Sequence, residues 1–237
     1  MRKPFKFKQF SIHQDQCAMK IGTDGVLLGA WASVSEDPYA ILDIGAGTGL
    51  IALMLAQRAN ASSIDAIEID EKAYEQCVEN FESSPWGDLL FCYHAGLDEF
   101  VEEIEEQYEL IVSNPPFYTE EVSSGNTSRD MARQNQSLPF EELLDGVSRL
   151  LTDHGRFATI IPHKEETAFL KIAASYNLFP KRITHVKGSP TSEIKRSLLE
   201  LHFQESQPTP DSLTIELERH QYTQEYIDLT KDFYLKM

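Results

Sequence analysis

The sequence predicts an α/β domain of the doubly wound type, with a mostly parallel sheet and antiparallel strands at one edge. Short β-branched or apolar runs alternate with longer helical patterns from residue 40 to about residue 176, as strands joined by helical crossovers do. After about residue 178, strand-like runs follow one another without full helices between them. The chain has 237 residues, a length that suits one large domain and buries a core without disulfides.

The alternation begins with an apolar run at 40–45 (AILDIG), which predicts a strand, and helical spacing of apolar residues predicts a helix over 49–59. The later crossover elements follow in order. We expect strands at 63–70, 89–94, 108–113 and 155–162, and helices at 71–83, near 140–151 and near 164–176. The acidic run 99–109 is typical of a solvated helix face.

Segments outside this alternation complete the predicted fold. LFPKRITHVKG, KRSLLELHFQ and SLTIELE predict antiparallel edge strands, and EYIDLTKDFYLKM predicts a closing helix. Near the N-terminus, Thr23 and Asp24 mark a helix start, with one of the two as its cap. The polar stretch 118–138 is long for a loop, and loops of this length are often functional.

Composition limits the classes of function. The formal net charge of −17 argues against a broad nucleic-acid-binding surface, although RKPFKFK and EIKRS are locally basic and leave a nucleic-acid substrate open. Cys17, Cys77 and Cys92 are widely spaced without a CxxC, which argues against a zinc site or disulfide framework and favours a reducing compartment. No apolar run reaches the length of a membrane span, and the basic N-terminus lacks an apolar signal segment. We therefore expect a cytoplasmic protein without a metal.

A glycine turn, DIGAGTG, lies between the first predicted strand and helix. Its GxGxG spacing differs from that of dinucleotide-binding turns, yet it still lets a ligand approach the helix N-terminus. Asp43 would repel a pyrophosphate but could hold the ammonium of an amino-acid moiety. Glu68 ends the next strand, where a carboxylate can accept hydrogen bonds from ribose hydroxyls. Turn and acid together indicate S-adenosylmethionine. The predicted cofactor ligands are Asp43, Gly45, Gly47, Gly49 and Glu68.

A second motif, IVSNPPFY, ends the strand at 108–113 with Asn114, Pro115, Pro116 and Phe117. An exocyclic amine of a base is a poor nucleophile because its lone pair is delocalised. Hydrogen bonds accepted by the Asn114 side-chain oxygen and the Pro115 carbonyl would favour a more tetrahedral nitrogen. The ring of Phe117 offers a surface on which a base can stack. The corner is therefore predicted to hold a planar amine for methyl transfer, which needs mainly alignment.

These motifs resemble those of class I S-adenosylmethionine-dependent methyltransferases of the Asn-Pro-Pro-aromatic group. The chain is most similar to the bacterial tRNA adenine-N6 methyltransferases that modify the adenine beside the anticodon, position 37, of a valine tRNA. This narrower resemblance rests on five segments spread over the chain: FKFKQFSIHQDQCAMKIGTDGVLLGAW (5–31), LDIGAGTGLIALMLAQR (42–58), SPW (84–86), LIVSNPPFY (110–118) and YTQEYIDLTKDFYLKM (222–237).

The resemblance implies a Rossmann-like sheet of seven strands with an antiparallel edge hairpin, in a single domain over 1–237. Residues 1–38 would form an N-terminal extension on the active-site side, from which Lys20, Thr23 and Asp24 would fold over the cofactor or target. Related enzymes usually place an Asp against the cofactor adenine after the third strand. This chain has Gly96 there, and Asp98 is the candidate for that contact.

The resemblance also implies tRNA as the partner, with no membrane, and we expect a monomer. The candidates for holding RNA are Lys6, Lys8, Arg129, Arg133, Lys195 and Arg196. Three other functions remain open from the residues alone. The same corner could serve guanine N2 in ribosomal RNA, for which Phe117 is also typical, or a protein glutamine amide. The chain could also be a cofactor-binding assembly factor without catalysis.

Overall fold

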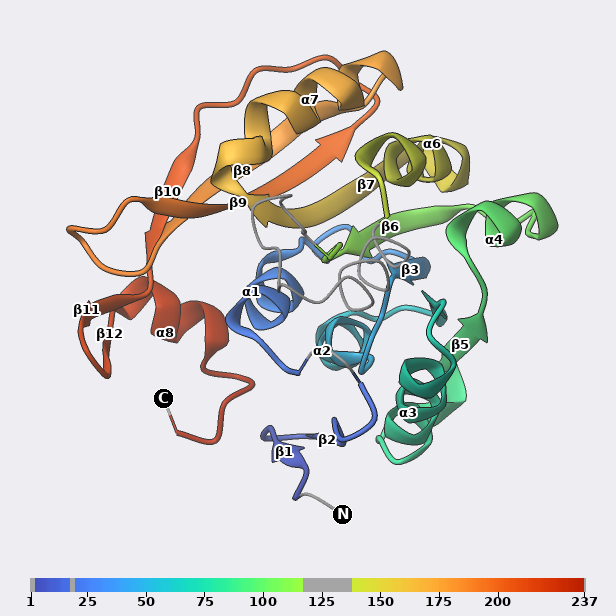
Figure 1. The fold of residues 1–237 in the computed structure, drawn as a ribbon, viewed down its shortest axis with the longest axis horizontal. Helices are drawn as coiled ribbons and strands as arrows, with labels where there is room; N and C mark the ends of the chain where they lie inside the picture. The colour runs from blue at the N-terminus through green and yellow to red at the C-terminus, as the bar shows by residue number, and fades with distance from the viewer. Residues whose placement is uncertain (1–2, 18–19, 117–137, 237) are drawn as a thin grey trace, which may run out of the picture.

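The computed structural model describes residues 3–17, 20–116 and 138–236. One eight-stranded sheet crosses the molecule with helices on both faces (Figure 1). Its strands are β3 (Ala40–Ile44), β4 (Ser63–Glu68), β5 (Leu90–His94), β6 (Tyr108–Ser113), β7 (Leu151–Pro162), β8 (Phe179–Lys187), β9 (Ile194–His202) and β10 (Asp211–Thr214). The helices are α1 (Thr23–Trp31), α2 (Leu50–Arg58), α3 (Glu71–Glu82), α4 (Leu97–Glu103), α6 (Phe140–Leu150), α7 (Glu166–Ser175) and α8 (Gln224–Thr230). Two small hairpins, β1 (Phe5–Lys6) with β2 (Ser11–Ile12) and β11 (Glu216–Glu218) with β12 (Gln221–Tyr222), lie outside the sheet.

The central strands β3 and β6 are buried on both faces, which explains why they are nearly continuous apolar runs. On one face, α1, α2, α3 and α8 contribute to one apolar cluster, in which Leu28 and Leu53 are fully buried. On the other face, α4, α6 and α7 form a second cluster around Leu144 and Phe169, also fully buried (Figure 1). The predicted doubly wound α/β fold is therefore confirmed.

The parallel strands place their carboxyl ends at one edge of the sheet. β3 pairs in parallel with β4 on one side and with β6 on the other, and β7 continues the parallel set beyond β6. From β3 the sheet continues to β4 and β5 on one side, whereas the later strands β6 and β7 lie on its other side. Ligands of open α/β sheets bind in the crevice at the point where the strand order reverses in this way. The glycine turn after β3 and the Asn114 corner after β6 both lie there.

The edge of the sheet differs from the prediction in its strand count. The antiparallel hairpin of β8 and β9 is present as expected. The SLTIELE segment, expected to be antiparallel, instead supplies β10, which runs parallel to β8 and makes the sheet eight-stranded rather than seven-stranded. β9 has no free edge, because β8 and β7 lie on its two sides. The chain therefore crosses to the free edge of β8 and pairs there.

Two local predictions also need correction. Helix α1 begins at Thr23, but its N-cap is Gly22 and no side chain caps it. Asp24 is the second residue of the helix rather than its cap, and its carboxylate accepts a 2.7 Å hydrogen bond from Arg196 Nε. The acidic run 99–109 is helical only as far as Glu103, after which the chain enters β6.

The N-terminal segment crosses the helical layer toward the carboxyl edge of the sheet. Phe7 bridges to Tyr234 near the other end of the chain. The backbone of His13 exchanges two hydrogen bonds with the buried side chain of Asn80 on α3, at 2.8 and 2.9 Å. Beyond them, Cys17 reaches the cavity described below. Among the described residues, no helix has the length and apolar character that crossing a bilayer requires.

Candidate active site

The glycine turn after β3 depends on three left-handed glycines, each for its own reason. Gly45, Gly47 and Gly49 have φ values of 73°, 57° and 76°. A Cβ added to Gly45 or Gly47 would meet nothing within 4 Å, whereas one on Gly49 would lie 2.5 Å from Cε1 of Phe81. The first two glycines therefore leave space for a ligand. Gly49 instead lets α2 begin against α3, so we propose that it acts through packing rather than cofactor contact.

The carboxylate of Glu68 lies at the centre of the turn. Its Oε2 accepts a 2.8 Å hydrogen bond from the backbone N–H of Gly47, and its Oε1 accepts a 2.9 Å bond from that of Asp70. These two bonds fix the carboxylate at the end of β4. Because each carboxylate oxygen can accept a second hydrogen bond, Glu68 can still hold a pair of ribose hydroxyls.

Asp43 lies beneath the turn and is fully buried. Its Oδ2 accepts a 3.1 Å hydrogen bond from the backbone N–H of Ala52 in the first turn of α2, and Oδ1 has no partner among the described residues. Burial raises the pKa of this carboxyl to about 7. Asp43 is not among the residues that line the cavity, so its predicted direct contact with the cofactor ammonium stays a prediction.

A cavity of about 290 Å³ opens at the carboxyl edge of the sheet, close to the lower end of the usual range for ligand pockets. It brings together residues predicted from two separate motifs. The predicted residues that line it are Gly45, Gly47, Glu68, Asp98, Asn114, Pro115 and Pro116. Apolar side chains from Ile67, Ile69 and Leu97 complete a wall suited to a nucleoside. The cavity therefore fits the predicted S-adenosylmethionine.

The corner after β6 faces this same cavity. Ser113 ends the strand, and its Oγ donates a 2.9 Å hydrogen bond to the carbonyl of Ile44 in β3. This bond ties the end of β6 to the strand that carries the glycine turn. Asn114 and Pro116 are half-buried and Pro115 is buried. A planar amine at this corner would thus lie beside the cofactor, while Phe117 falls outside the described residues.

Gly96 precedes α4, at the position where related enzymes usually carry an Asp. A Cβ on Gly96 would lie 2.7 Å from Oδ1 of Asp98. The Asp98 carboxylate therefore folds back to the place where a side chain on residue 96 would begin. Because Asp98 lines the cavity, we propose that it replaces the acidic side chain usual at that position and contacts the cofactor adenine.

The other predicted cofactor residues lie apart from the cavity. Lys20 is exposed, and none of Lys20, Thr23 and Asp24 is among the cavity-lining residues. Asp24 is instead paired with Arg196, which joins the start of α1 to the start of β9. Their predicted role over the cofactor or target stays a prediction.

The candidates for holding RNA occupy two separate parts of the fold. Lys6 and Lys8 are exposed on the N-terminal hairpin, and the Lys8 ammonium donates to the carbonyl of Lys231. Lys195 and Arg196 lie at the start of β9 (Figure 1). The Lys195 side chain is 65% exposed and weakly paired, with 3.9 Å between its Nζ and Oε2 of Glu193. Arg129 and Arg133 lie outside the described residues.

The cavity also contains residues that sequence reasoning missed. Ile69 lines the cavity and is 60% exposed. Because it directly follows Glu68, its place in the cavity could have been predicted from the sequence. Cys17 comes from the N-terminal segment, and Leu138 and Glu142 come from around the start of α6. Partial burial and the charge of Asp98 raise the pKa of Glu142. No sequence pattern placed these three residues near the cofactor.

Comparisons with known proteins agree with this site. The family model described as methyltransferase small domain matches residues 26–164. A protein of Flavobacterium johnsoniae named tRNA1(Val) (adenine(37)-N6)-methyltransferase is 62% identical over 98% of this chain and 100% of its own length. A Bacteroides fragilis protein of the same name is 46% identical over the full length of both chains.

Solved structures show a similar fold at low identity. A predicted O-methyltransferase from Agrobacterium tumefaciens has a TM-score of 0.66 at 17% identity and covers 89% of this chain and 96% of its own. A ribosomal protein L11 methylase from Lactobacillus delbrueckii has a TM-score of 0.54 at 13% identity, covering 77% of each chain.

Fold, cavity and comparisons together define an S-adenosylmethionine-dependent methyltransferase. The chain belongs to the methyltransferase small domain family. More narrowly, it belongs to the group formed by its full-length relatives from Flavobacterium and Bacteroides.

Proposed function

We propose that the protein transfers a methyl group from S-adenosylmethionine to N6 of adenine 37 in a valine tRNA, the reaction in the names of its relatives. One observation of the structure carries this proposal. Asn114, Pro115 and Pro116 line the same cavity as Gly47 and Glu68. The groups suited to a planar amine thus face the groups suited to the methyl donor.

The residues of the chain would do three things in this reaction. Gly45, Gly47, Glu68 and Asp98 would bind the nucleoside part of the cofactor, which supplies an electrophilic methyl group on a sulfonium. The side-chain oxygen of Asn114 and the backbone carbonyl of Pro115 would accept hydrogen bonds from the target amine. These bonds would orient its lone pair toward the methyl group, so alignment supplies most of the catalysis. The N–C bond would form as the donor's S–C bond breaks, which leaves a neutral thioether, and the methylated amine would release its extra proton to water. The scheme therefore needs no metal and no general base.

The target adenine must leave its stack to reach a corner of this kind. Extrusion costs less from a single-stranded loop than from a duplex, which favours an anticodon loop as substrate. We propose that Lys195, exposed at the start of β9, contacts the RNA backbone. Lys6 and Lys8 would make further contacts from the N-terminal hairpin.

We further propose that 1–237 act as one domain, with residues 1–38 as an extension that closes the cofactor side. The bonds between His13 and Asn80 and the place of Cys17 in the cavity support this arrangement. The proposed enzyme is cytoplasmic, since tRNA is its substrate and its three cysteines are free thiols. The expected monomeric state stays a prediction.

The test uses purified protein, labelled S-adenosylmethionine and total tRNA that lacks the modification. N6-methyladenosine should appear in one tRNA and map to position 37 after nuclease digestion and mass spectrometry. N2-methylguanosine in ribosomal RNA, or label in a protein glutamine, would replace the proposed substrate. No transfer to any of these would favour an assembly factor without catalysis.

A matched pair of variants tests the role of the corner. Asn114→Ala removes one acceptor of the target amine and should lower the rate of transfer on the order of 100-fold or more, by analogy with lost transition-state hydrogen bonds. Asn114→Asp keeps an acceptor oxygen at the same place and should retain more activity than the alanine variant. Both should bind S-adenosylmethionine nearly as well as the unaltered protein. Unchanged transfer by Asn114→Ala would refute the assignment.

A further inference from the structure

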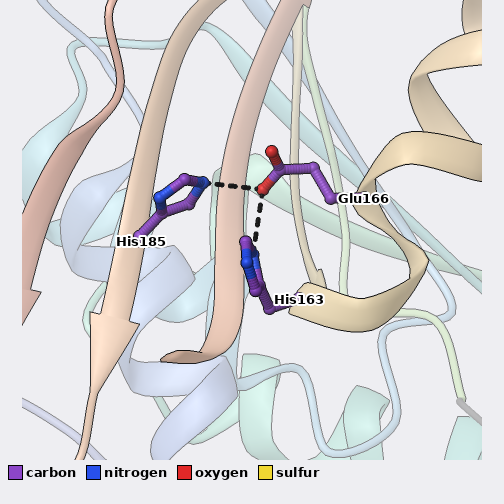
Figure 2. Close-up of side chains that lie close together, drawn as sticks. All are labelled: His163, Glu166 and His185. Carbon is purple, nitrogen blue, oxygen red and sulfur yellow. Dashed lines mark hydrogen bonds and ion pairs between the residues drawn. The ribbon is translucent and has the colours of Figure 1, made fainter. Parts of the chain in front are cut away.

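Two histidines and a glutamate converge on one point beyond the carboxyl end of β7. Nε2 of His185 lies 2.9 Å from Oε2 of Glu166, and Nδ1 of His163 lies 3.3 Å from the same oxygen. Figure 2 shows both imidazole rings turned toward this carboxylate. One ligand atom from each of the three residues lies within 4.8 Å of the others. We call these three residues the His-Glu-His cluster.

The topology of the sheet edge explains why these residues meet. His163 follows Pro162, the last residue of β7, and Glu166 is the first residue of α7. His185 in β8 is paired with Ser197 in the adjacent strand β9. The cluster therefore joins the β7–α7 connection to the edge hairpin, and its third residue is distant in sequence from the other two.

Hydrogen bonds link the three residues through Ser197. Oε2 of Glu166 is hydrogen-bonded to Nε2 of His185 and accepts a hydrogen bond from the hydroxyl of Ser197. Nδ1 of His163 lies 2.9 Å from that hydroxyl oxygen. Imidazole nitrogen and carboxylate oxygen are both ligands of first-row divalent ions, so the same atoms can bind a cation in place of these hydrogen bonds.

The distances between the ligand atoms suit a small ion. With metal–ligand bonds of about 2.0–2.2 Å, tetrahedral coordination separates ligand atoms by roughly 3.4 Å. The observed separations of 2.9 and 3.3 Å from Glu166 to the two histidines are within about 0.5 Å of that value, and all three ligand atoms lie within 4.8 Å of one another. Two histidines and one carboxylate also form a recurrent ligand set of zinc sites that keep a fourth position open.

Burial at the cluster favours a formed site over a chance surface contact. The side chains of His163, Glu166 and His185 are 34%, 16% and 18% exposed, which leaves an ion a route of entry. Ser197 is fully buried, and its hydroxyl is fixed by the hairpin register. It can orient the Glu166 carboxylate as outer-shell partners of metal ligands do.

We propose that His163, Glu166 and His185 bind a divalent ion of the Zn²⁺ class. This proposal amends the expectation of a protein without a metal, which rested on the spacing of the cysteines. The ion would join the start of α7 to β8 at the sheet edge where β6 delivers Asn114. It has no part in the proposed methyl transfer, so its binding can be measured independently of that reaction.

The test measures Zn²⁺ binding to the full chain without an affinity tag, after treatment with a chelator, by competition with a chromophoric indicator. One equivalent should bind to the unaltered protein. Loss of an outer-shell partner alone costs roughly 10- to 100-fold in affinity, so His185→Asn and Glu166→Gln should each lose at least that. The control is His154→Asn, which alters an exposed histidine at the other end of β7 and should bind as the unaltered protein does.

Two further readings make the outcome decisive. Circular dichroism establishes whether each variant is folded. If His185→Asn does not fold, the affinity of Glu166→Gln decides the test. Co²⁺ bound at the cluster should show visible absorption bands without the intense thiolate bands that a cysteine site would give. Absence of stoichiometric Zn²⁺ binding, or equal affinity in the two cluster variants and the unaltered protein, would overturn the proposal.

Discussion

Gly47 and Gly49 lie in one turn with similar left-handed backbones, yet the structure predicts different consequences for replacing them by alanine. A left-handed backbone costs an ordinary residue about 1–2 kcal/mol. At Gly47 this is the whole structural cost, because a Cβ would meet nothing within 4 Å. At Gly49 the Cβ would also lie 2.5 Å from Phe81 and 2.9 Å from Cys77. Such overpacking adds about 1–3 kcal/mol, for a total of about 2–5 kcal/mol.

The two variants should therefore separate stability from cofactor binding. Urea unfolding measures the free energy of unfolding, provided that its dependence on urea keeps the same slope, and calorimetric titration measures the affinity for S-adenosylmethionine. Gly49→Ala should lose more stability than Gly47→Ala. Gly47→Ala should lose more affinity, since its methyl group would enter the cavity. Equal stability of the two variants, or normal affinity in Gly47→Ala, would refute the reasoning.

Three other predictions follow from buried or exposed polar groups. The pKa of Asp43 is about 7 in the folded chain and about 3.9 in an unfolded one, so the folded state retains a proton that the unfolded state releases. Its contribution to the free energy of unfolding is present below about pH 4 and declines up to about pH 7, by at most about 1.4 kcal/mol per pH unit. Asp43→Asn should remove this pH dependence of the free energy of unfolding, as measured by urea unfolding at several pH values. An unchanged pH dependence would contradict the assigned pKa. Asn80→Ala leaves the backbone of His13 without its partners, which should cost about 1–3 kcal/mol and speed amide exchange at His13, whereas unchanged exchange would show that Asn80 does not hold the segment. Lys195→Glu should weaken tRNA binding and reduce the salt dependence of the affinity by about one phosphate contact, and an unaltered salt dependence would remove Lys195 from the RNA surface.

Much of the fold could be predicted because local patterns and tertiary packing agree. The apolar run of β6 and the alternation from β3 to α7 have the lengths and spacings expected for a doubly wound sheet. Prediction failed where partners distant in sequence decide the structure. β10 pairs in parallel with the free edge of β8, and no pattern within SLTIELE reveals that this edge is free. At the start of α1, the predicted capping side chain of Asp24 instead pairs with Arg196, 172 positions away.

The candidate site shows the same division. Glu68 and Asn114 could be predicted because Glu68 ends β4, Asn114 directly follows β6, and the carboxyl ends of these parallel strands meet at one edge. Cys17 and Glu142 enter the cavity through packing of the N-terminal segment and α6, and neither has a motif of its own. Asp43 is next to the glycine turn in sequence, but its side chain is buried beneath the turn, so its predicted contact with the cofactor stays a prediction. The His-Glu-His cluster has a short spacing between His163 and Glu166, but its third residue depends on strand pairing.

The contact between the two ends of the chain has a practical consequence. Phe7 bridges to Tyr234, and the backbone N–H of Lys8 donates a 2.8 Å hydrogen bond to the carbonyl of Phe233. Since the ends lie together, a short flexible linker could join them, and new termini could be opened at an exposed turn elsewhere. Such a circular permutant should retain the sheet. Conversely, removing the chain from residue 233 onward should release the N-terminal hairpin, because the contacts of Phe7 and Lys8 with Tyr234 and Phe233 would be lost.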